Sequence, residues 1–251
     1  MDVDERSAVE IINEAGRSQI VLLCEHASNY IPRDYRALGL DALQLRRHIA
    51  WDIGAAGLTR LLSRRLDAPA FLGTHSRLLI DLNRPLGASD SIPVRSEDTD
   101  IPGNIGLDDV EREHRARSIF TPFHDRVAAH LDRRAGLGKP TCVLAVHSFT
   151  PVFLGMSRPW HAGVLHGDVD SFALAILRSL QADHGLHAEA NVPYVVSRDD
   201  DYAIPVHGDD RGLPSALIEI RQDLLDSESA QEAWSVRLAT TLKKVLAEKT
   251  S

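Results

Sequence analysis

The sequence is poor in cysteine and in aromatic residues, and it has no long apolar run. It contains 2 cysteines and 5% aromatic residues in a chain of 251 residues. Cys24 and Cys142 each lie inside a short apolar stretch, and no C-x-x-C pair is present. We therefore expect two small core residues rather than a disulfide or a cysteine-based zinc site. The longest apolar runs have the length of a strand, so no membrane span is expected.

The chain also lacks a surplus of positive charge. Its net charge is −8, whereas a general nucleic-acid binder needs a basic face that displaces counterions. The first residues are acidic and amphipathic, without the basic and apolar segments of a secretory signal. We therefore expect a cytoplasmic protein that binds neither nucleic acid nor a membrane. A local basic pocket for a small anionic substrate is compatible with this charge.

Strand-like and helix-like segments alternate along the chain. Strands are expected within residues 19–24, 69–83, 141–148, 162–167, 188–197 and 215–221, and helices within 41–66, 108–135, 170–185 and 227–249. This alternation predicts a three-layer α/β/α fold with a largely parallel or mixed central sheet. No linker or repeat interrupts it, which predicts one domain over residues 1–251. Residues 85–106 form a long expected loop, and loops of this length are usually functional or disordered.

Two histidines come at the ends of expected strands. His26 follows the first apolar run, and His147 follows the run TCVLAV. Open α/β sheets bind ligands at the carboxyl ends of their strands. Zinc favours imidazole, and a catalytic zinc needs about three protein ligands and one open position. A lone histidine in such a place is more often a structural residue, but two at equivalent strand ends favour a metal site.

The third ligand should be a carboxylate. Asp52 lies in the apolar stretch IAWDIGAA, where an unpaired carboxylate would be costly. Its alternative role is that of a hydrogen-bonded helix residue. Glu25 is a rival ligand, but neighbouring residues of a strand point to opposite faces. We therefore prefer Asp52.

Glu219 lies between two isoleucines in an expected buried strand. A carboxylate at a sheet end near a metal is suited to take a proton from water. The alternative is a structural salt bridge, for example with Arg77 or Arg84. Those arginines and Asn83 could equally form a planar fork that grips a substrate carboxylate. The residues alone leave both alternatives open.

Five segments resemble the N-formylglutamate amidohydrolase family: CEHASNYIP, HIAWDIGAAGLTRLL, SRLLIDLNRP, VHSFTP and HGDDRGLPSALIEIRQDLL. The resemblance covers roughly residues 20–226. The resemblance implies an α/β/α fold related to zinc carboxypeptidases and amidases, of the phosphorylase/hydrolase-like kind. It implies zinc-dependent hydrolysis of an N-acyl amino acid, which in the type reaction releases formate from N-formyl-L-glutamate. This chain has EHAS where the deformylases of histidine breakdown read PHSG, so it is similar to a broader branch, and the chemistry carries over better than the substrate.

The resemblance also implies roles for individual residues. It implies one zinc ion per chain, held by His26, Asp52 and His147, and Glu219 as the general base. It implies a substrate-carboxylate site made by the residues Arg77, Asn83 and Arg84. Three further residues in the resembling segments receive no role: Tyr202, His207 and His124, the last expected on a helix surface.

Two other functions stay open at this point. One keeps the zinc and acts on a larger amide, as a peptidase or a cell-wall amidase; the absence of a visible secretion signal counts against it. The other is a catalytically silent protein that binds carboxylates through Arg77 and Arg84. Retention of the whole set of predicted metal ligands and base argues against a pure binder, since each buried polar group is costly.

Overall fold

The computed structural model of the protein describes residues 6–168 and 170–248. The start of the acidic N-terminal segment and Lys249, at the end of the last expected helix, lie outside these residues. Among the described residues, no helix combines the length and the apolar character that a membrane crossing requires.

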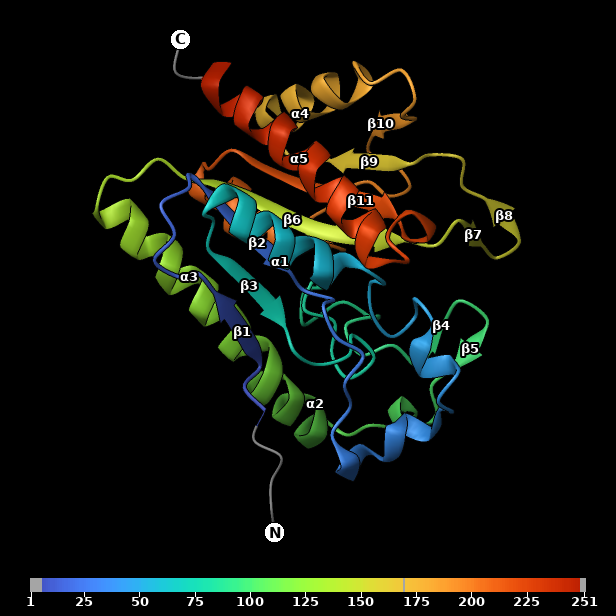
Figure 1. Ribbon diagram of the computed structural model, residues 1–251. Helices are drawn as coiled ribbons and strands as arrows, with labels where there is room; N and C mark the ends of the chain where they lie inside the picture. Colours follow the sequence, from blue (N-terminus) through green and yellow to red (C-terminus); the bar gives the residue numbers. More distant parts are fainter. Residues whose placement is uncertain (1–5, 169, 249–251) are drawn as a thin grey trace.

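A mixed sheet of seven strands forms the middle layer (Figure 1). Its strands are β1 (Val9–Ile12), β2 (Ile20–Cys24), β3 (Ala70–Gly73), β6 (Cys142–Phe149), β9 (Ala162–Leu165), β10 (Ala188–Ala190) and β11 (Ser215–Arg221). The spatial order is β1-β3-β2-β6-β11-β9-β10. Strands β3, β2, β6 and β11 run parallel to one another, whereas β1 is antiparallel to β3 and β9 is antiparallel to β11.

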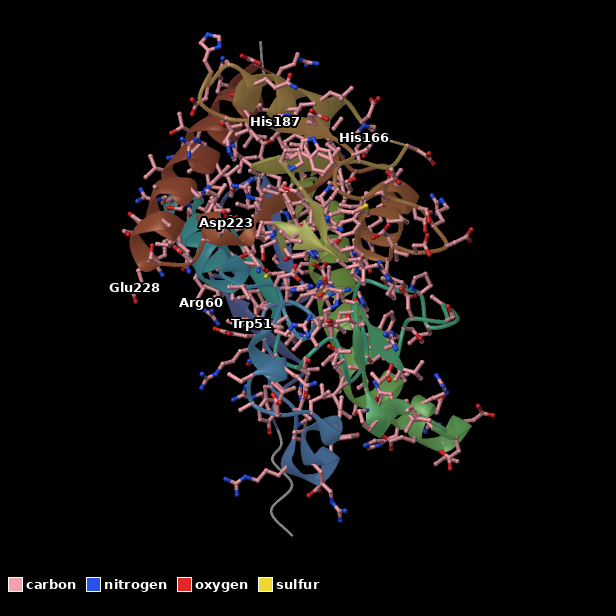
Figure 2. All side chains as sticks on the ribbon, turned by 90° about the vertical axis from the view of Figure 1, so that its right-hand side faces the viewer. Trp51, Arg60, His166, His187, Asp223 and Glu228 are labelled. Atoms are coloured by element: carbon pink, nitrogen blue, oxygen red, sulfur yellow. The ribbon has the colours of Figure 1, made fainter. Side chains whose placement is uncertain are left out.

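Helices cover both faces of the sheet, which confirms the predicted α/β/α layers (Figure 1). One face carries α1 (Ala55–Leu66), α4 (Ser171–Gln181) and α5 (Glu228–Glu248), and the other carries α3 (Thr121–Gly136). The helix α2 (Asp109–Arg115) leads into α3 through a π-helical turn. In Figure 2, Arg60 of α1 and Glu228 of α5 lie on the same side of the molecule, where these two helices pack together.

The central strands are buried on both faces. In β2, the side chains of Ile20, Leu22 and Cys24 join the core under α1, and those of Val21 and Leu23 join the core under α3. A strand covered on both sides needs apolar residues at every position. This requirement explains the uninterrupted run IVLLC, and it brings the polar residues that follow to the edge of both cores.

The segment 41–66 departs from the expectation of one long helix or two abutting helices. Only its second half, α1, is helical; the first half contains the short 3-10 turn Gln44–Arg46. Asp41 caps this turn, because its Oδ1 accepts the backbone N–H groups of Leu43 and Gln44 at 2.8 Å. Gly54 begins α1 with a φ of +82°, a conformation that favours glycine. Asp52 therefore lies in the connection before the helix and not on it.

Several short elements complete the fold, and β1 was not among the expected strands. The segment 69–83 contains only β3, followed by turns. The long loop 85–106 holds the small hairpin of β4 (Arg95–Ser96) and β5 (Thr99–Asp100), and a second hairpin pairs β7 (Val152–Phe153) with β8 (Met156–Ser157). The remaining helical turns are Arg33–Gly39, Pro102–Asn104, Ala203–Gly208, Asp209–Arg211 and Gln222–Leu224.

Candidate metal centre and active site

Three segments bring the predicted metal ligands to one end of the sheet. His26 follows β2, and His147 lies near the end of the adjacent parallel strand β6. Asp52 reaches them from the connection before α1. Its backbone N–H donates to the carbonyl of His26 at 2.9 Å, and its Oδ2 accepts the backbone N–H of Ser148 at 3.1 Å. Both contacts fix the carboxylate between the two strand ends.

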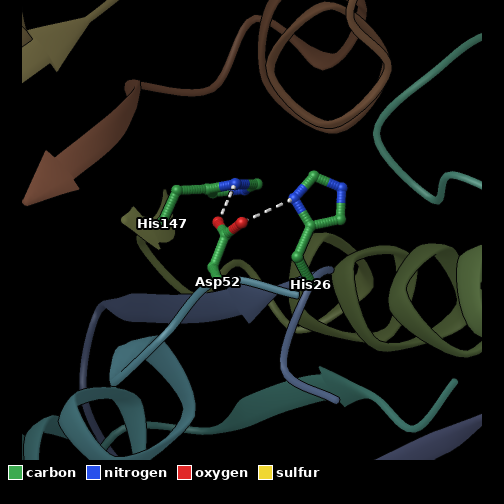
Figure 3. Close-up of side chains that lie close together, drawn as sticks. All are labelled: His26, Asp52 and His147. Carbon is green, nitrogen blue, oxygen red and sulfur yellow. Dashed lines mark ion pairs between the residues drawn. The ribbon is translucent and has the colours of Figure 1, made fainter. Parts of the chain in front are cut away.

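The three side chains converge on one point (Figure 3). Asp52 Oδ2 lies 2.9 Å from His147 Nδ1, and Asp52 Oδ1 lies 3.5 Å from His26 Nδ1. One donor atom from each residue falls within 4.8 Å of the others, and all three residues are buried. Two imidazoles and one carboxylate are a ligand set that zinc uses in catalytic sites.

The Nε2 atom of each histidine, on the ring side away from Asp52, contacts a further carboxylate. His26 Nε2 lies 2.6 Å from Asp81 Oδ1, and His147 Nε2 lies 2.9 Å from Glu25 Oε2. Ionised carboxylates only accept hydrogen bonds, so each Nε2 donates. In the neutral imidazoles, both Nδ1 lone pairs then point at the oxygens of Asp52. Arg77 Nη1 lies 3.2 Å from His26 Nδ1 and 3.7 Å from Asp52 Oδ1, so its guanidinium balances part of the carboxylate charge. Two imidazole lone pairs that face one carboxylate form a donor set that fits a divalent metal.

Glu25, the rival third ligand, thus occupies a different place from Asp52. It lies on the far nitrogen of His147, where a carboxylate fixes the ring orientation and makes the opposite nitrogen more basic. Its side chain is fully buried. Asp81 does the same for His26, and it also accepts from Arg77 Nη2 at 2.5 Å.

The surrounding charges hold these acids in their ionised form. Burial alone would raise the pKa of Asp52, but the charges and hydrogen bonds of His26 and His147 outweigh it and lower that pKa. Burial also opposes ionisation of Asp81, yet the charge of Arg77 and the contact with His26 hold its pKa well below the ordinary value. Burial works against the charged form of His147, whereas its two carboxylate neighbours raise its pKa. The site is therefore rich in negative charge, which suits a cation.

Glu219 stands directly beside this group. It lies on β11, in register with His147 on one side and with Gly163 of β9 on the other. Its Oε2 is buried and has no hydrogen-bond partner among the described residues. Burial is the largest influence on its pKa and raises it to about 7. A carboxyl group with this pKa can both accept and release a proton near neutral pH.

The three predicted carboxylate-binding residues line the same cavity, but most of their donors are already occupied. Arg77 Nη1 lies 3.2 Å from His26 Nδ1. Arg84 donates through Nε to Asp90 at 2.9 Å and through Nη1 to the backbone carbonyl of Asp200. The ion pairs of Arg77 with Asp81 and of Arg84 with Asp90 neutralise much of the positive charge that a substrate carboxylate would meet.

Asn83 is the most occupied of the three. Its side-chain oxygen accepts the backbone N–H groups of Tyr202 and Ala203, at 3.3 and 2.9 Å, and its Nδ2 donates to Asp201 Oδ1 at 3.0 Å. These bonds tie the loop 198–208 to the rim of the cavity. The visible contacts of Asn83 are thus with the loop, and one hydrogen of its amide stays available to a ligand.

The cavity has a volume of about 430 Å³, and residues of both hairpins contribute to its lining. Such a volume suits a small molecule. The cavity is lined by the metal-site residues, Glu219 and the arginines. Apolar and aromatic side chains also line it, namely Phe149, Phe153, Leu165, Tyr194, Val195 and Leu217.

His124 is not on the surface, and the expectation of a helix-surface histidine was wrong. Its side chain is buried; Nε2 lies 2.9 Å from the carbonyl oxygen of Leu82, and Nδ1 lies 2.9 Å from His207 Nε2. The ring of Tyr202 packs against His124 at 4.2 Å between centroids. The buried carbonyl of Leu82 needs a hydrogen-bond donor, and His124 supplies one. This contact explains why a histidine occupies a buried position of the helix.

Two residues of the site received no role from the sequence. Asp81 follows an apolar run much as Asp52 does, and the cost of burying its charge was the available signal. Tyr194 lies in a polar loop with no apolar periodicity, so nothing in its neighbourhood distinguished it. Its place on the cavity wall depends on how the loop crosses the sheet.

Comparisons with known proteins agree with this geometry. The family model for N-formylglutamate amidohydrolase matches residues 18–225. The structure of gene product Atu2144 from Agrobacterium tumefaciens is 38% identical, with a TM-score of 0.95 and coverage of 98% of both chains. N-formylglutamate amidohydrolase from Ralstonia eutropha JMP134 has the same fold at 18% identity, with a TM-score of 0.70 over 96% of this chain and 98% of its own. No curated protein matches the sequence.

The family match covers most of the chain, including every segment that builds the metal centre and the strand of Glu219. The protein is accordingly a hydrolase that acts on amide bonds. It belongs to the N-formylglutamate amidohydrolase family.

Proposed function

We propose that the protein is a zinc-dependent amidohydrolase that removes the N-acyl group, such as formyl, from a small amino acid with a free carboxylate. The observation that carries this proposal is the convergence of His26, Asp52 and His147, each imidazole backed by a buried carboxylate. Family membership supplies the reaction class. The cavity of about 430 Å³ supports a small substrate rather than a long peptide.

The ligands would be His26 Nδ1, one oxygen of Asp52 and His147 Nδ1, with one zinc ion per chain. A zinc ion there would polarise the amide carbonyl and make water acidic enough to supply hydroxide near neutral pH. Glu25 and Asp81 hold the two imidazoles so that each presents its Nδ1 lone pair. The protein thus contributes buried, negatively charged ligands whose orientation is fixed by hydrogen bonds.

Glu219 acts as the general base of the proposed reaction. Its buried, unpaired Oε2 takes a proton from the attacking water and then passes it to the departing amine. The raised pKa of about 7 makes both transfers feasible for the same carboxyl group. Its register with His147 on the neighbouring strand supports this role, because His147 is one of the proposed ligands.

Substrate orientation falls to Arg77, Asn83 and Arg84. Each keeps at least one donor without a partner among the described residues: Nε of Arg77, one amide hydrogen of Asn83 and Nη2 of Arg84. These donors are available to a substrate carboxylate while the ion pairs to Asp81 and Asp90 stay intact. Holding the substrate in this way contributes to the rate by orientation.

Metal analysis and formate release test the proposal. Untagged protein is expected to contain about one zinc per chain and to release formate from N-formyl-L-glutamate or another N-formyl amino acid. His26→Ala and His147→Ala should lose both the metal and the activity. His184→Ala, which changes an exposed histidine, is the matched control and should keep both. Wild-type protein that takes up no metal when zinc is supplied would contradict the proposed mechanism.

A further inference from the structure

Tyr194 lines the same cavity as the metal-site residues, and the residue is 44% exposed. Partial burial raises the pKa of its phenol, and the negative charge of Glu219 raises it further. The hydroxyl therefore keeps its proton at neutral pH. None of the proposed roles uses this residue.

Arg158 determines what the Tyr194 hydroxyl can do. Its Nη1 donates to the hydroxyl oxygen at 3.0 Å. The guanidinium also stacks on the rings of Tyr194 and Phe153, 4.9 and 4.6 Å from their centroids. Arginine has no acceptor atoms, so the proton of the tyrosine cannot go back to it. No acceptor for that proton is present among the described residues, and Arg158 has no carboxylate partner there either.

The backbone holds this arrangement close to Glu219. Gly163 is the residue of β9 in register with Glu219. A Cβ atom on Gly163 would lie 1.7 Å from the carbonyl oxygen of Val192. The loop with Tyr194 therefore crosses β9 directly at this glycine, in contact with the backbone, and only a residue without a side chain permits so close an approach.

We propose that Tyr194 contacts the substrate: its hydroxyl donates a hydrogen bond to an oxygen of the bound N-acyl amino acid. Arg158 is the positioning residue that fixes the direction of this donor. The proposal rests on the proposed amidohydrolase function, because it assumes that the amide lies between the metal centre and Tyr194. The acceptor is a carbonyl or a carboxylate oxygen of the substrate, and the measurements below separate the two.

The test compares Tyr194→Phe with the wild type in two assays on zinc-loaded protein. The first is the affinity for acetohydroxamate, a small metal-binding carbonyl compound without a carboxylate, by calorimetry. The second is kcat and KM for N-formyl-L-glutamate. One neutral hydrogen bond corresponds to about a tenfold loss of affinity at most, and a donor to a developing oxyanion to about 10²-fold in kcat. Tyr202→Phe is the matched control, because Tyr202 packs against His124.

Loss of acetohydroxamate affinity and of kcat assigns the carbonyl oxygen, and a rise in KM alone assigns the carboxylate. Arg158→Gln should reproduce the defect in part, and Arg158→Lys should restore less than full activity because it cannot stack on two rings. Gly163→Ala should act like Tyr194→Phe by moving the loop.

Unchanged affinity, kcat and KM in Tyr194→Phe overturn the proposal. If the wild type binds acetohydroxamate but hydrolyses no N-formyl amino acid, the proposed function fails and the affinity alone decides on Tyr194. If the wild type binds no acetohydroxamate, both proposals fail.

Discussion

Mild acid should destabilise the fold through His207. This side chain is only 1% exposed, and burial is the largest influence on its pKa, which is lowered from 6.5 to about 4. The effects of neighbouring charges on this pKa partly cancel, since Glu25 and Asp132 raise it and Arg211 lowers it. His207 Nε2 donates a hydrogen bond to His124 Nδ1. The other ring nitrogen of His207, Nδ1, is buried and has no hydrogen-bond partner among the described residues.

The size and sign of the effect follow from linkage. Above pH 6.5 His207 is neutral in both states, so it adds no pH dependence. Between pH 6.5 and about 4 the unfolded chain binds a proton that the folded chain does not, so the free energy of unfolding falls as the pH falls. At pH 5 this loss amounts to about 2 kcal/mol, from 1.36 kcal/mol per pKa unit. Burial lowers the pKa of His124 as well, which acts in the same direction.

Urea unfolding at pH 7.5 and pH 5 measures this loss. His207→Gln keeps a donor near the position of Nε2 but cannot take a proton, so we expect it to lose about 2 kcal/mol less than the wild type between these pH values. His184→Gln, at an exposed histidine, should behave like the wild type. An equal loss in His207→Gln and the wild type would refute the reasoning.

Two further predictions concern the metal centre. Glu219→Gln should retain zinc but lose about 10²- to 10⁴-fold in kcat, measured by formate release, because it removes the general base; turnover close to that of the wild type would show that another group takes the proton. Asp81→Asn should weaken zinc binding about 10- to 100-fold in competition with a chelating dye, because His26 loses its carboxylate support. Asp90→Asn, at the partly exposed partner of Arg84, is the control, and equal zinc affinities in the two variants would contradict the supporting role of Asp81.

The strands and the ligand types were accessible from the sequence for a physical reason. Strands β2, β6 and β11 are buried on both faces, so their residues form uninterrupted apolar runs that end in polar side chains. His26, Asp52 and His147 stand out because a charged or polar group at such a place needs a partner. The structure brings these three together, as the sequence suggested.

Other features depend on contacts between distant segments. The apolar pattern of 41–66 resembles one helix, but Ala50 packs into the core under α3 while α1 packs under the opposite face. Asp81 supports His26 across 55 residues of sequence. The short β1 has two partly exposed isoleucines and pairs only at the sheet edge. No local pattern encodes such contacts, and the wrong placement of His124 has the same origin.

The position of β11 has a consequence for how the protein is made. It is the last strand among residues 6–168 and 170–248, yet it lies in the middle of the sheet, between β6 and β9. Until residues 215–221 leave the ribosome, β6 and β9 each present an unpaired edge, and such edges favour association with other chains. The same strand delivers Glu219, so an incomplete chain has neither a closed sheet nor the proposed base. Closure of the sheet and delivery of the proposed base are thus one event in synthesis.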